Sequence, residues 1–267
     1  MALSPFQRRT KICELLKEGR PLTVGELCRY FAVSSMTIRR DLIYLEAEEK
    51  LRRMRGGAEP IRTEEYEPAF HLRAKENAYE KALIGKAAAA LVKDGEVLII
   101  DVGTTFLSFI RFLSPSKQVT VLTNWLPNVL ELARYPQIHT VLLGGTLRNA
   151  ELSLVGGMTR DMLMSFNADK AFIGVGGISL EKGLTDYNMD EVEVKRAMLR
   201  AAREVFVLAD HTKLDRVAPV GIAPLKVVHN LVVDEGINTQ EYDKLRSHGI
   251  NVIVATDMGK GGDKNEL

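Results

Sequence analysis

The stretch that decides the fold runs from Leu22 to Ala58 and reads LTVGELCRYFAVSSMTIRRDLIYLEAEEKLRRMRGGA. Thr23 and Glu26 have the spacing of a capping box, in which the hydroxyl accepts from one backbone amide and the carboxylate accepts from the other. We therefore expect a helix to begin at Thr23, preceded by a helix over residues 5–18 that Gly19 ends. The apolar side chains expected to face inward from these two helices are Phe6, Ile12, Leu15, Leu16, Leu27, Tyr30 and Phe31.

A third helix is predicted after Ser34, whose hydroxyl suits an N-cap. Ile38, Leu42 and Leu45 follow the i, i+4, i+7 spacing of a face turned toward a core. A helix of this size fits the DNA major groove, where arginine pairs with guanine and a methyl group contacts thymine. The face of this helix opposite to the core includes Tyr44. The side chains predicted to contact DNA from this helix are Ser35, Met36, Thr37, Arg39 and Arg40.

Residues 50–57 are strongly basic and end in two glycines that permit a tight turn, as in a hairpin. Arg52, Arg53 and Arg55 suit phosphates or a minor groove better than base edges, so we predict that they bind all DNA sequences alike. A solvated basic hairpin is the alternative for a charge run of this kind. The helix pair directly before it favours DNA binding.

The segments VSSMTIRRDLIYLE and LRRMRGGA closely resemble the N-terminal signature of the DeoR family of bacterial sugar-responsive transcriptional regulators. The resemblance covers residues 6–60 and implies a winged helix-turn-helix DNA-binding domain. Three positions depart from the family pattern: Glu49 stands where a helix-ending glycine is common, Lys50 where leucine is common, and Arg55 where histidine is frequent. The extra positive charge should strengthen nonspecific contact with DNA.

The composition indicates two domains, because a chain of 267 residues of which 46% are hydrophobic can build two packed cores. The net charge of +1 hides an asymmetry: residues 1–60 carry 12 Lys and Arg against 8 Asp and Glu, and the remainder is acidic. Cys13 and Cys28 are expected to be reduced thiols, with no disulfide, metal or other cofactor. No apolar run has the length of a membrane span and no secretion signal is visible, so we expect a cytoplasmic protein.

Residues 61–79 are polar and are predicted to form a partly ordered linker. From residue 80 to residue 257, helices alternate with short β-rich runs, and residues 258–267 form a polar tail. The predicted strands are 97–100, 119–123, 140–143, 171–175, 205–208, 227–233 and 252–254, and the predicted helices are 80–92, 106–113, 127–134, 160–166, 191–203 and 239–247. The expected fold class is α/β, with a winged helix-turn-helix domain over residues 1–60 followed by a larger α/β domain with a mainly parallel sheet.

Ligands bind such sheets beyond the carboxyl ends of the strands. Residues 101–105, Asp-Val-Gly-Thr-Thr, follow the first apolar strand and open a helix, so their amides and hydroxyls suit a phosphate. The segment is not a P-loop, and the absence of GxGxxG argues against a dinucleotide. An ordinary turn capped by Thr104 or Thr105 is the alternative. Small or polar residues that would leave room for a ligand also follow the next strands, at Thr123-Asn124, Gly144-Gly145-Thr146 and Gly174-Val175-Gly176-Gly177.

Together with residues 191–195 and 210–213, these turns resemble the DeoR-family effector domain, which is related to ribose-5-phosphate isomerase. The resemblance implies a bound phosphorylated sugar or a similar metabolite. It places near the phosphate Gly103, Thr104, Thr105 and Asn124, with Lys213 as a cationic partner, and it gives hydroxyl contacts to Asp101, Gly176, Glu191 or Lys195. The alternatives are a surface ion pair between Glu191 and Lys195, and a loop position without ligand contact for His211.

The favoured function is transcriptional repression of sugar catabolism genes, in which a homo-oligomer holds a double-stranded DNA operator until a phosphosugar binds. Activation is an alternative. A phosphosugar isomerase would need an acid and a base, which Glu191, Glu193 and Lys195 could supply. The isomerase relatives, however, carry an acidic cluster where this chain has Gly-Gly-Ile-Ser, so we expect no catalytic residues and no enzyme. A ligand-free DNA-organising protein would leave the four turns without a purpose.

Overall fold

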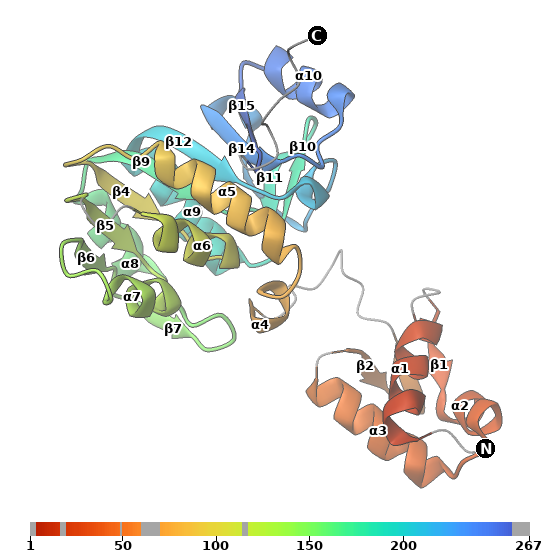
Figure 1. Cartoon of the computed structure of the whole chain (residues 1–267). Coiled ribbons are helices and arrows are strands. Elements are labelled where there is room, and N and C mark those ends of the chain that lie inside the picture. Colours follow the sequence, from red (N-terminus) through yellow and green to blue (C-terminus); the bar gives the residue numbers. More distant parts are fainter. Residues whose placement is uncertain (1–3, 17–19, 49, 60–69, 114–116, 258–267) are drawn as a thin grey trace. The chain divides into compact units, whose positions relative to one another are not determined.

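The structure is a computed structural model of the chain, and it describes residues 4–16, 20–48, 50–59, 70–113 and 117–257. The chain forms two compact units, residues 1–68 (unit 1) and residues 69–267 (unit 2) (Figure 1). The predicted helix stop at Gly19, the departure at Glu49 and the tail 258–267 lie outside the described residues. None of the helices within the described ranges has the length and apolar character needed to span a bilayer.

Unit 1 contains three helices and a small antiparallel sheet, as the sequence predicts. In chain order its elements are α1 (Pro5–Leu16), β1 (Leu22–Thr23), α2 (Val24–Phe31), α3 (Ser35–Ala47), β2 (Arg52–Met54) and β3 (Gly57–Glu59), with strand order β1-β3-β2. Both sides of the capping box between Thr23 and Glu26 are formed, and the Ser34 hydroxyl accepts from the Thr37 amide. Ile38, Leu42 and Leu45 are at most 1% exposed, so the inward face of the third helix is confirmed.

Two side chains expected in this core are not there. Phe6 is 79% exposed and Tyr30 is 57% exposed. Phe6 lies in the first turn of α1 and lines a surface hollow together with Tyr44 of α3, and Tyr30 packs edge-on against Phe31 at the surface. The predicted inward role of these two aromatic residues is therefore wrong, while Ile12, Leu16 and Leu27 are buried as expected.

The paired glycines of the hairpin have separate roles. Gly56 has a φ of +91°, a left-handed conformation that favours glycine, so it makes the turn between β2 and β3. Gly57 pairs with Thr23 in β1, and a Cβ there would lie 2.2 Å from the Leu22 carbonyl oxygen. The first glycine shapes the tip and the second lets the hairpin pack against β1.

A buried ion-pair cluster that the sequence did not predict joins α1 to α3. Asp41 is 1% exposed and accepts from the Arg8 guanidinium at 2.5 Å and from the Arg9 guanidinium at 2.8 Å. The Arg9 guanidinium also lies over the Tyr44 ring, 3.8 Å from its centroid. These contacts hold the central part of α3 against α1.

Unit 2 is built on a seven-stranded sheet in which all neighbouring strands are parallel, with the order β15-β14-β12-β9-β4-β5-β6. The predicted mainly parallel α/β fold is confirmed. The strands are β4 (Val97–Ile100), β5 (Thr120–Thr123), β6 (His139–Leu142), β9 (Ala168–Ile173), β12 (Ala202–Leu208), β14 (Asn230–Asp234) and β15 (Asn251–Ala255). One strand begins three residues later than predicted, because Pro224 starts a 3₁₀ turn over Leu225–Val227.

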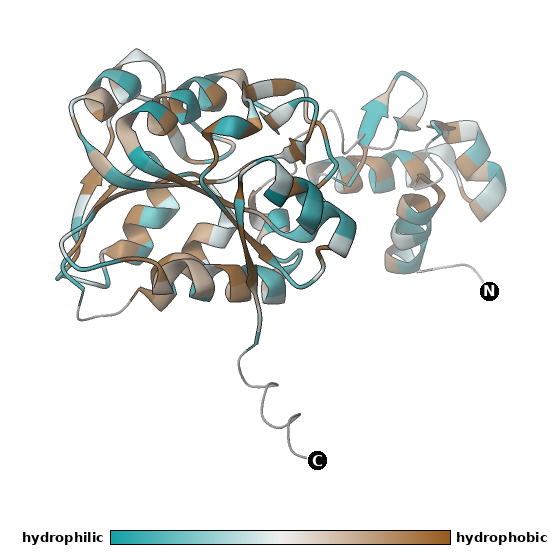
Figure 2. Ribbon diagram, turned by 90° about the horizontal axis from the view of Figure 1, so that it is seen from above, coloured by the Kyte–Doolittle hydropathy of each residue, from teal (hydrophilic) through white to brown (hydrophobic). Residues whose placement is uncertain are grey.

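Helices cover both faces of this sheet (Figures 1 and 2). They are α5 (Ala78–Ala90), α6 (Thr104–Phe112), α7 (Leu126–Leu132), α8 (Gly157–Met164), α9 (Met189–Ala201) and α10 (Thr239–Ser247). Leu98 and Ile100 join the core with α5 and α6, whereas Ile99 joins the core with α8 and α9. The strand is thus an uninterrupted apolar run because both of its faces are buried.

Several shorter elements were not predicted. A hairpin of β7 (Thr146–Arg148) and β8 (Ser153–Val155) follows β6. A separate antiparallel sheet contains β10 (Gly177–Ser179), β11 (Gly183–Asp186) and β13 (Val220–Ala223). A short helix, α4 (Phe70–Arg73), precedes α5, and a 3₁₀ turn, η1 (His211–Lys213), follows β12.

Candidate DNA interface and effector site

The outward face of α3 presents the residues predicted to contact DNA. Ser35, Arg39 and Arg40 are exposed, and Met36 is 62% exposed. Thr37 is half-buried because its hydroxyl lies 2.9 Å from the Ser34 hydroxyl. Within the described residues, neither Arg39 nor Arg40 forms an ion pair or a side-chain hydrogen bond. Both guanidinium groups are therefore available to another molecule.

The arginines of the β2–β3 hairpin differ in whether a carboxylate pairs with their guanidinium groups. Arg53 turns back to α3, where its guanidinium donates to Glu46 at 2.6 Å, and Arg52 lies 3.8 Å from Glu59. Arg55 is exposed beside the Gly56 turn and has no ion-pair partner among the described residues. Arg55 is thus the hairpin cation that is most available for a phosphate.

Four polar turns meet at one edge of the large sheet, because β9, β4, β5 and β6 are parallel neighbours. Asp101, directly after β4, is 1% exposed and accepts from the Gly174 amide at 2.9 Å and from the Lys195 ammonium. Lys195 also donates to the Gly174 carbonyl oxygen at 2.9 Å and lies 3.3 Å from Asp186. Asp101 and Lys195 therefore join β4, β9, β11 and α9 behind this edge.

Lys195 is held as an ammonium group. Burial acts to lower its pKa, but the carboxylates of Asp101 and Asp186 outweigh burial and raise the pKa above its usual value. A lysine held in this state cannot accept a proton from a substrate carbon near neutral pH. The site therefore lacks the lysine base that an isomerase could use.

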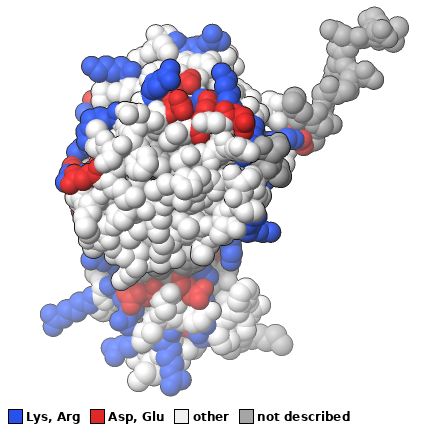
Figure 3. Space-filling view, turned by 90° about the vertical axis from the view of Figure 1, so that its left-hand side faces the viewer, with Lys and Arg blue, Asp and Glu red and all other residues white. Residues whose placement is uncertain are grey.

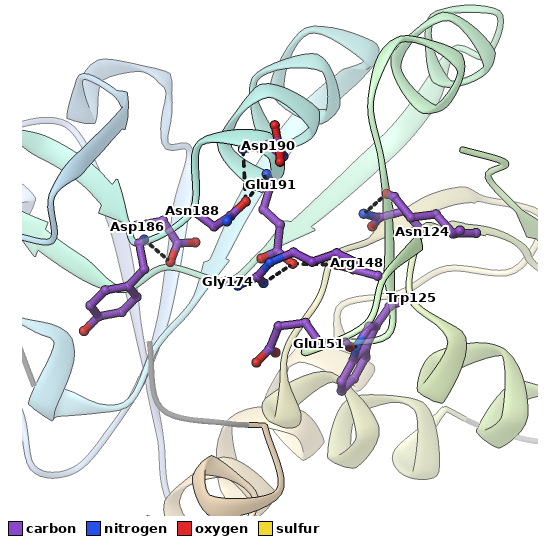
Figure 4. Close-up of polar contacts among 12 residues, drawn as sticks. Asn124, Trp125, Arg148, Glu151, Gly174, Asp186, Asn188, Asp190 and Glu191 are labelled. Atoms are coloured by element: carbon purple, nitrogen blue, oxygen red, sulfur yellow. Dashed lines mark hydrogen bonds and ion pairs between the residues drawn. The ribbon is translucent and has the colours of Figure 1, made fainter. Parts of the chain in front are cut away.

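Glu191 does not form the surface ion pair with Lys195 that was the alternative interpretation. It is 3% exposed and accepts from the Ser153 hydroxyl at 2.6 Å and from the Arg148 guanidinium at 2.8 Å. Figure 4 shows its carboxylate reaching from the start of α9 toward Arg148, with Glu151 and Trp125 nearby. The unpredicted β7–β8 hairpin supplies both partners, so sequence spacing alone could not place Glu191.

The first turn of α6 has no side-chain cap. The N-cap residue is Gly103, and neither Thr104 nor Thr105 caps the helix, in contrast to the alternative interpretation of this turn. Both threonines are 9% exposed, and the Thr104 hydroxyl donates to the Arg73 carbonyl oxygen at 3.5 Å. The positive end of α6 is therefore left with unsatisfied amides, the arrangement that binds phosphate in other proteins.

A buried acceptor and a half-buried cation complete the site. Asn124 is 1% exposed; its amide donates to the Leu154 carbonyl oxygen at 2.9 Å, but its Oδ1 has no hydrogen-bond partner among the described residues. Lys213 is half-buried in η1, and in the described part of the chain its ammonium makes no hydrogen bond or ion pair. Burial lowers the pKa of Lys213, and Arg216 and Arg73 add to this effect against Asp210.

Lys81 adds to the positive charge near Arg73. Its ammonium donates to the carbonyl oxygens of Glu76, at 2.6 Å, and of Arg73, and burial lowers its pKa. Because Arg73 also contacts Thr104 and couples to Lys213, the cations and the first turn of α6 belong to one region. An anion there would face the charges of Lys81, Arg73 and Lys213, which Asp210 and Glu76 offset in part.

Three glycines predicted to leave room for a ligand instead make room for the protein. A Cβ on Gly145 would lie 2.0 Å from the Thr159 hydroxyl oxygen, and one on Gly177 would lie 2.4 Å from the Arg216 carbonyl oxygen. A Cβ on Gly176 would lie 2.8 Å from the Tyr187 ring, and the Gly176 amide donates to the Thr185 carbonyl oxygen. The expectation of open space is therefore wrong at these positions, whereas Gly144 has open space beside it.

The contacts of α4 were not predicted from the sequence. Arg73 forms an ion pair with Glu151, which is 2% exposed, and the Phe70 ring meets Trp125 edge-on at 6.1 Å. The Trp125 indole is fully buried and donates to the Glu151 carbonyl oxygen at 2.6 Å. A lone tryptophan directly after the Thr123-Asn124 turn was the available signal. His211, by contrast, pairs with Asp234 at 2.8 Å.

No three His, Cys, Asp or Glu side chains of the described residues come together as a metal site.

A family model described as DeoR-like helix-turn-helix domain matches residues 8–64, and one described as DeoR C terminal sensor domain matches residues 76–235. The chain belongs to the DeoR family. As a DeoR-family member it is a DNA-binding transcriptional regulator with a small-molecule sensor domain and not an enzyme, so the predicted family and the rejection of an isomerase are confirmed.

Curated relatives of this DeoR-family chain match along nearly their whole length. HTH-type transcriptional regulator GolR of Listeria innocua is 34% identical over 94% of this chain and 99% of the relative. HTH-type transcriptional repressor GlcR of Bacillus subtilis is 34% identical over 96% and 98%. Among solved structures, the full-length sorbitol operon regulator SorC of Klebsiella pneumoniae is 14% identical over 91% of this chain and 99% of that chain, with a TM-score of 0.43.

Proposed function

We propose that this DeoR-family regulator represses sugar catabolism genes and that a phosphorylated sugar, bound at the carboxyl edge of the large sheet, releases it from DNA. Among its relatives, GlcR of Bacillus subtilis is named a repressor, and an Escherichia coli O157:H7 relative, 30% identical over 93% of both chains, is named a putative aga operon transcriptional repressor. The observation that carries the choice of ligand is the uncapped first turn of α6 together with the half-buried Lys213, both of which lie near Arg73.

The phosphate would occupy the amino end of α6. There the amides of Thr104 and Thr105 and their hydroxyls would donate to its oxygens, and Gly103 allows close approach because it has no side chain. Lys213 would supply the cation, because its ammonium is partly desolvated and without a partner in the described residues. A neutral sugar would leave this positive charge uncompensated.

The sugar hydroxyls would find acceptors a short way along the same edge. Asn124 Oδ1 is buried without a partner in the described part of the chain, and a hydroxyl donor would satisfy it. Glu191 offers a second acceptor next to Arg148. In this proposal Asp101, Lys195 and Gly176 support the site from behind, since their polar groups already bond to the protein.

Ligand binding would reach the DNA-binding unit through α4. Arg73 in α4 accepts from Thr104, pairs with Glu151 and couples to Lys213, so a phosphate at α6 would compete for the groups that hold α4. This helix is the first described element of unit 2 after residues 60–69, which join it to unit 1. A tenfold change in DNA affinity needs about 1.4 kcal/mol of difference between the liganded and free states.

The DNA contacts would come from both parts of unit 1. Ser35, Met36, Thr37, Arg39 and Arg40 on α3 would enter the major groove, and Arg52, Arg53 and Arg55 would meet phosphates. Arg53 would have to leave Glu46 to do so, whereas Arg55 needs no rearrangement. In this proposal residues 1–60 bind DNA, residues 80–257 sense the effector, and a homo-oligomer reads two half-sites.

Calorimetric titration of the full chain with a panel of pentose and hexose phosphates and the matching unphosphorylated sugars tests the proposal. At least one sugar phosphate should bind, and its parent sugar should bind at least tenfold more weakly. Lys213→Gln should weaken binding, whereas Lys226→Gln, which changes an exposed lysine outside the site, should not. Equal binding of a sugar and its phosphate, or no binding by the whole panel, would contradict the proposed ligand.

A further inference from the structure

One end of the large sheet is left open in the described part of the chain. β6 is the last strand in the order, and β5 is its only sheet neighbour among the described strands. Large apolar side chains are exposed on β6 and on the elements that follow or flank it: Leu130 at 74%, Leu142 at 36%, Leu147 at 43%, Met158 at 68% and Met164 at 50%. Figure 3 shows a broad area without charged side chains on the side where β5, β6, α7 and α8 lie.

The hydrogen bonds between β6 and β5 show which backbone groups of β6 point away from the sheet. The amides of His139 and Leu143 donate to the Val119 and Thr123 carbonyl oxygens of the neighbouring segment at 2.9 Å each. Because a strand alternates the direction of its peptide groups, Thr140 and Leu142 direct their amide and carbonyl groups away from β5. No backbone hydrogen bond from these two outward amides is formed within the described residues.

We infer that β6 is the contact between two copies of this chain, which pair their β6 strands antiparallel about a two-fold axis at Val141. Thr140 of one copy would face Leu142 of the partner copy, and the two pairs would exchange four backbone hydrogen bonds. Val141 would face Val141 of the second copy as the close, non-hydrogen-bonded pair on the axis. The two seven-stranded sheets would become one continuous sheet.

The occupant is a second copy because the surface is complementary to itself. A two-fold contact needs one patch that matches itself, and an uncharged patch meets its own copy without repulsion. β6 also has neither a lysine nor a proline, the residues that commonly prevent edge pairing. The inference rests on the proposed function in one respect: a winged helix that reads two half-sites requires two copies of the chain.

Cysteine cross-linking tests the register. In a close antiparallel pair the Cα atoms lie about 4.5 Å apart, within the range of a disulfide. Oxidised Val141→Cys full-length chain should therefore give a covalent dimer on a non-reducing gel. Leu142→Cys is the matched control, because position 142 faces position 140 of the partner and should cross-link far less. Equal yields for both variants, or a yield no higher than that of the unmodified chain with its Cys13 and Cys28, would overturn the register.

Sedimentation of edge variants tests the interface itself. Thr140→Pro removes an outward amide and leaves the bonds to β5 in place, and Leu142→Lys adds a charge to the patch. Both should raise the dimer dissociation constant at least tenfold, whereas Phe6→Lys, at an exposed position of unit 1, should not. Trp125 fluorescence checks that unit 2 remains folded. A monomeric unmodified chain, or edge variants that associate normally, would overturn the inference.

This result is separable from the proposed function. Dimers that depend on β6 with no affinity for any sugar phosphate would contradict the proposed ligand and leave the interface standing. Sugar phosphate binding with association unaffected by the edge variants would do the reverse.

Discussion

Replacement of Asp41 by alanine should strongly destabilise unit 1. The side chain is 2% exposed, and its principal partner Arg8 is 8% exposed. Loss of the carboxylate would break this buried ion pair, a change that typically costs about 3–5 kcal/mol. Arg9 is 27% exposed and lies over Tyr44, so water compensates its loss in part. We therefore expect a cost near the lower end, about 3 kcal/mol.

This cost is large for so small a unit. At about 0.05–0.15 kcal/mol per residue, residues 1–68 are stabilised by roughly 3–10 kcal/mol. Asp41→Ala should therefore remove between about a third and nearly all of this stability and weaken DNA binding through loss of folded unit 1, although Asp41 itself is too buried to contact DNA. Effector binding in unit 2 should remain.

Urea denaturation can separate the two units, because the only tryptophan, Trp125, lies in unit 2. Far-UV circular dichroism reports the helices of both units, and tryptophan fluorescence reports unit 2. With a urea dependence of about 1 kcal/mol per M for a domain of this size, the unit 1 transition should shift by about 3 M while the fluorescence transition stays in place. Glu48→Ala, at the exposed carboxylate of the residue that caps the C-terminus of α3, is the control and should change little. A loss below about 1 kcal/mol in Asp41→Ala would show that Asp41 contributes no more than a solvated surface pair does.

Four further predictions concern the two sites. Arg40→Ala should weaken specific DNA binding by about 1–3 kcal/mol and relax sequence preference. Arg55→Ala should weaken binding to all DNA sequences alike and reduce the slope of log affinity against log salt concentration by about 1. Fluorescence anisotropy with specific and random duplexes measures both effects. Thr104→Ala combined with Thr105→Ala should weaken effector binding at least tenfold in calorimetry and keep DNA affinity; an unchanged effector affinity would exclude these hydroxyls as phosphate contacts. Because burial lowers the pKa of Lys213 and an anion binds its ammonium form, effector affinity should fall as the pH rises through that lowered pKa, and a flat pH profile would argue against Lys213 as the cation.

Local patterns determined most of what the sequence could predict. The capping box at Thr23 and the inward face of Ile38, Leu42 and Leu45 depend on residues within one or two helical turns, and both were found. The strands of the parallel sheet were visible because burial on both faces makes them continuous apolar runs. Phe6 shows the limit of such local patterns. Its spacing matches the inward face of the first helix, but it lies in the first turn of α1 and its side chain is exposed.

Contacts between distant residues could not be predicted. Asp41 meets Arg8 across 33 positions, and Arg73 meets Glu151 across 78 positions, so no spacing rule links them. The β7–β8 hairpin, which gives Glu191 its partners, is short and lacks the Asn-Gly or Asp-Gly turn that would have signalled it. The glycines of the turns show a related difficulty: composition indicated small residues, but only the packing shows that Thr159 and Tyr187 fill the space beside them.

The most direct test is the affinity of the full chain for an operator fragment, measured with and without the sugar phosphate that binds it. The fragment would first be selected by the protein from genomic DNA. We expect saturating sugar phosphate to weaken operator binding at least tenfold and the parent sugar to have no such effect. The Thr104→Ala and Thr105→Ala double variant should bind DNA equally tightly in both conditions. An operator affinity that no bound sugar phosphate changes would contradict release from DNA by the effector.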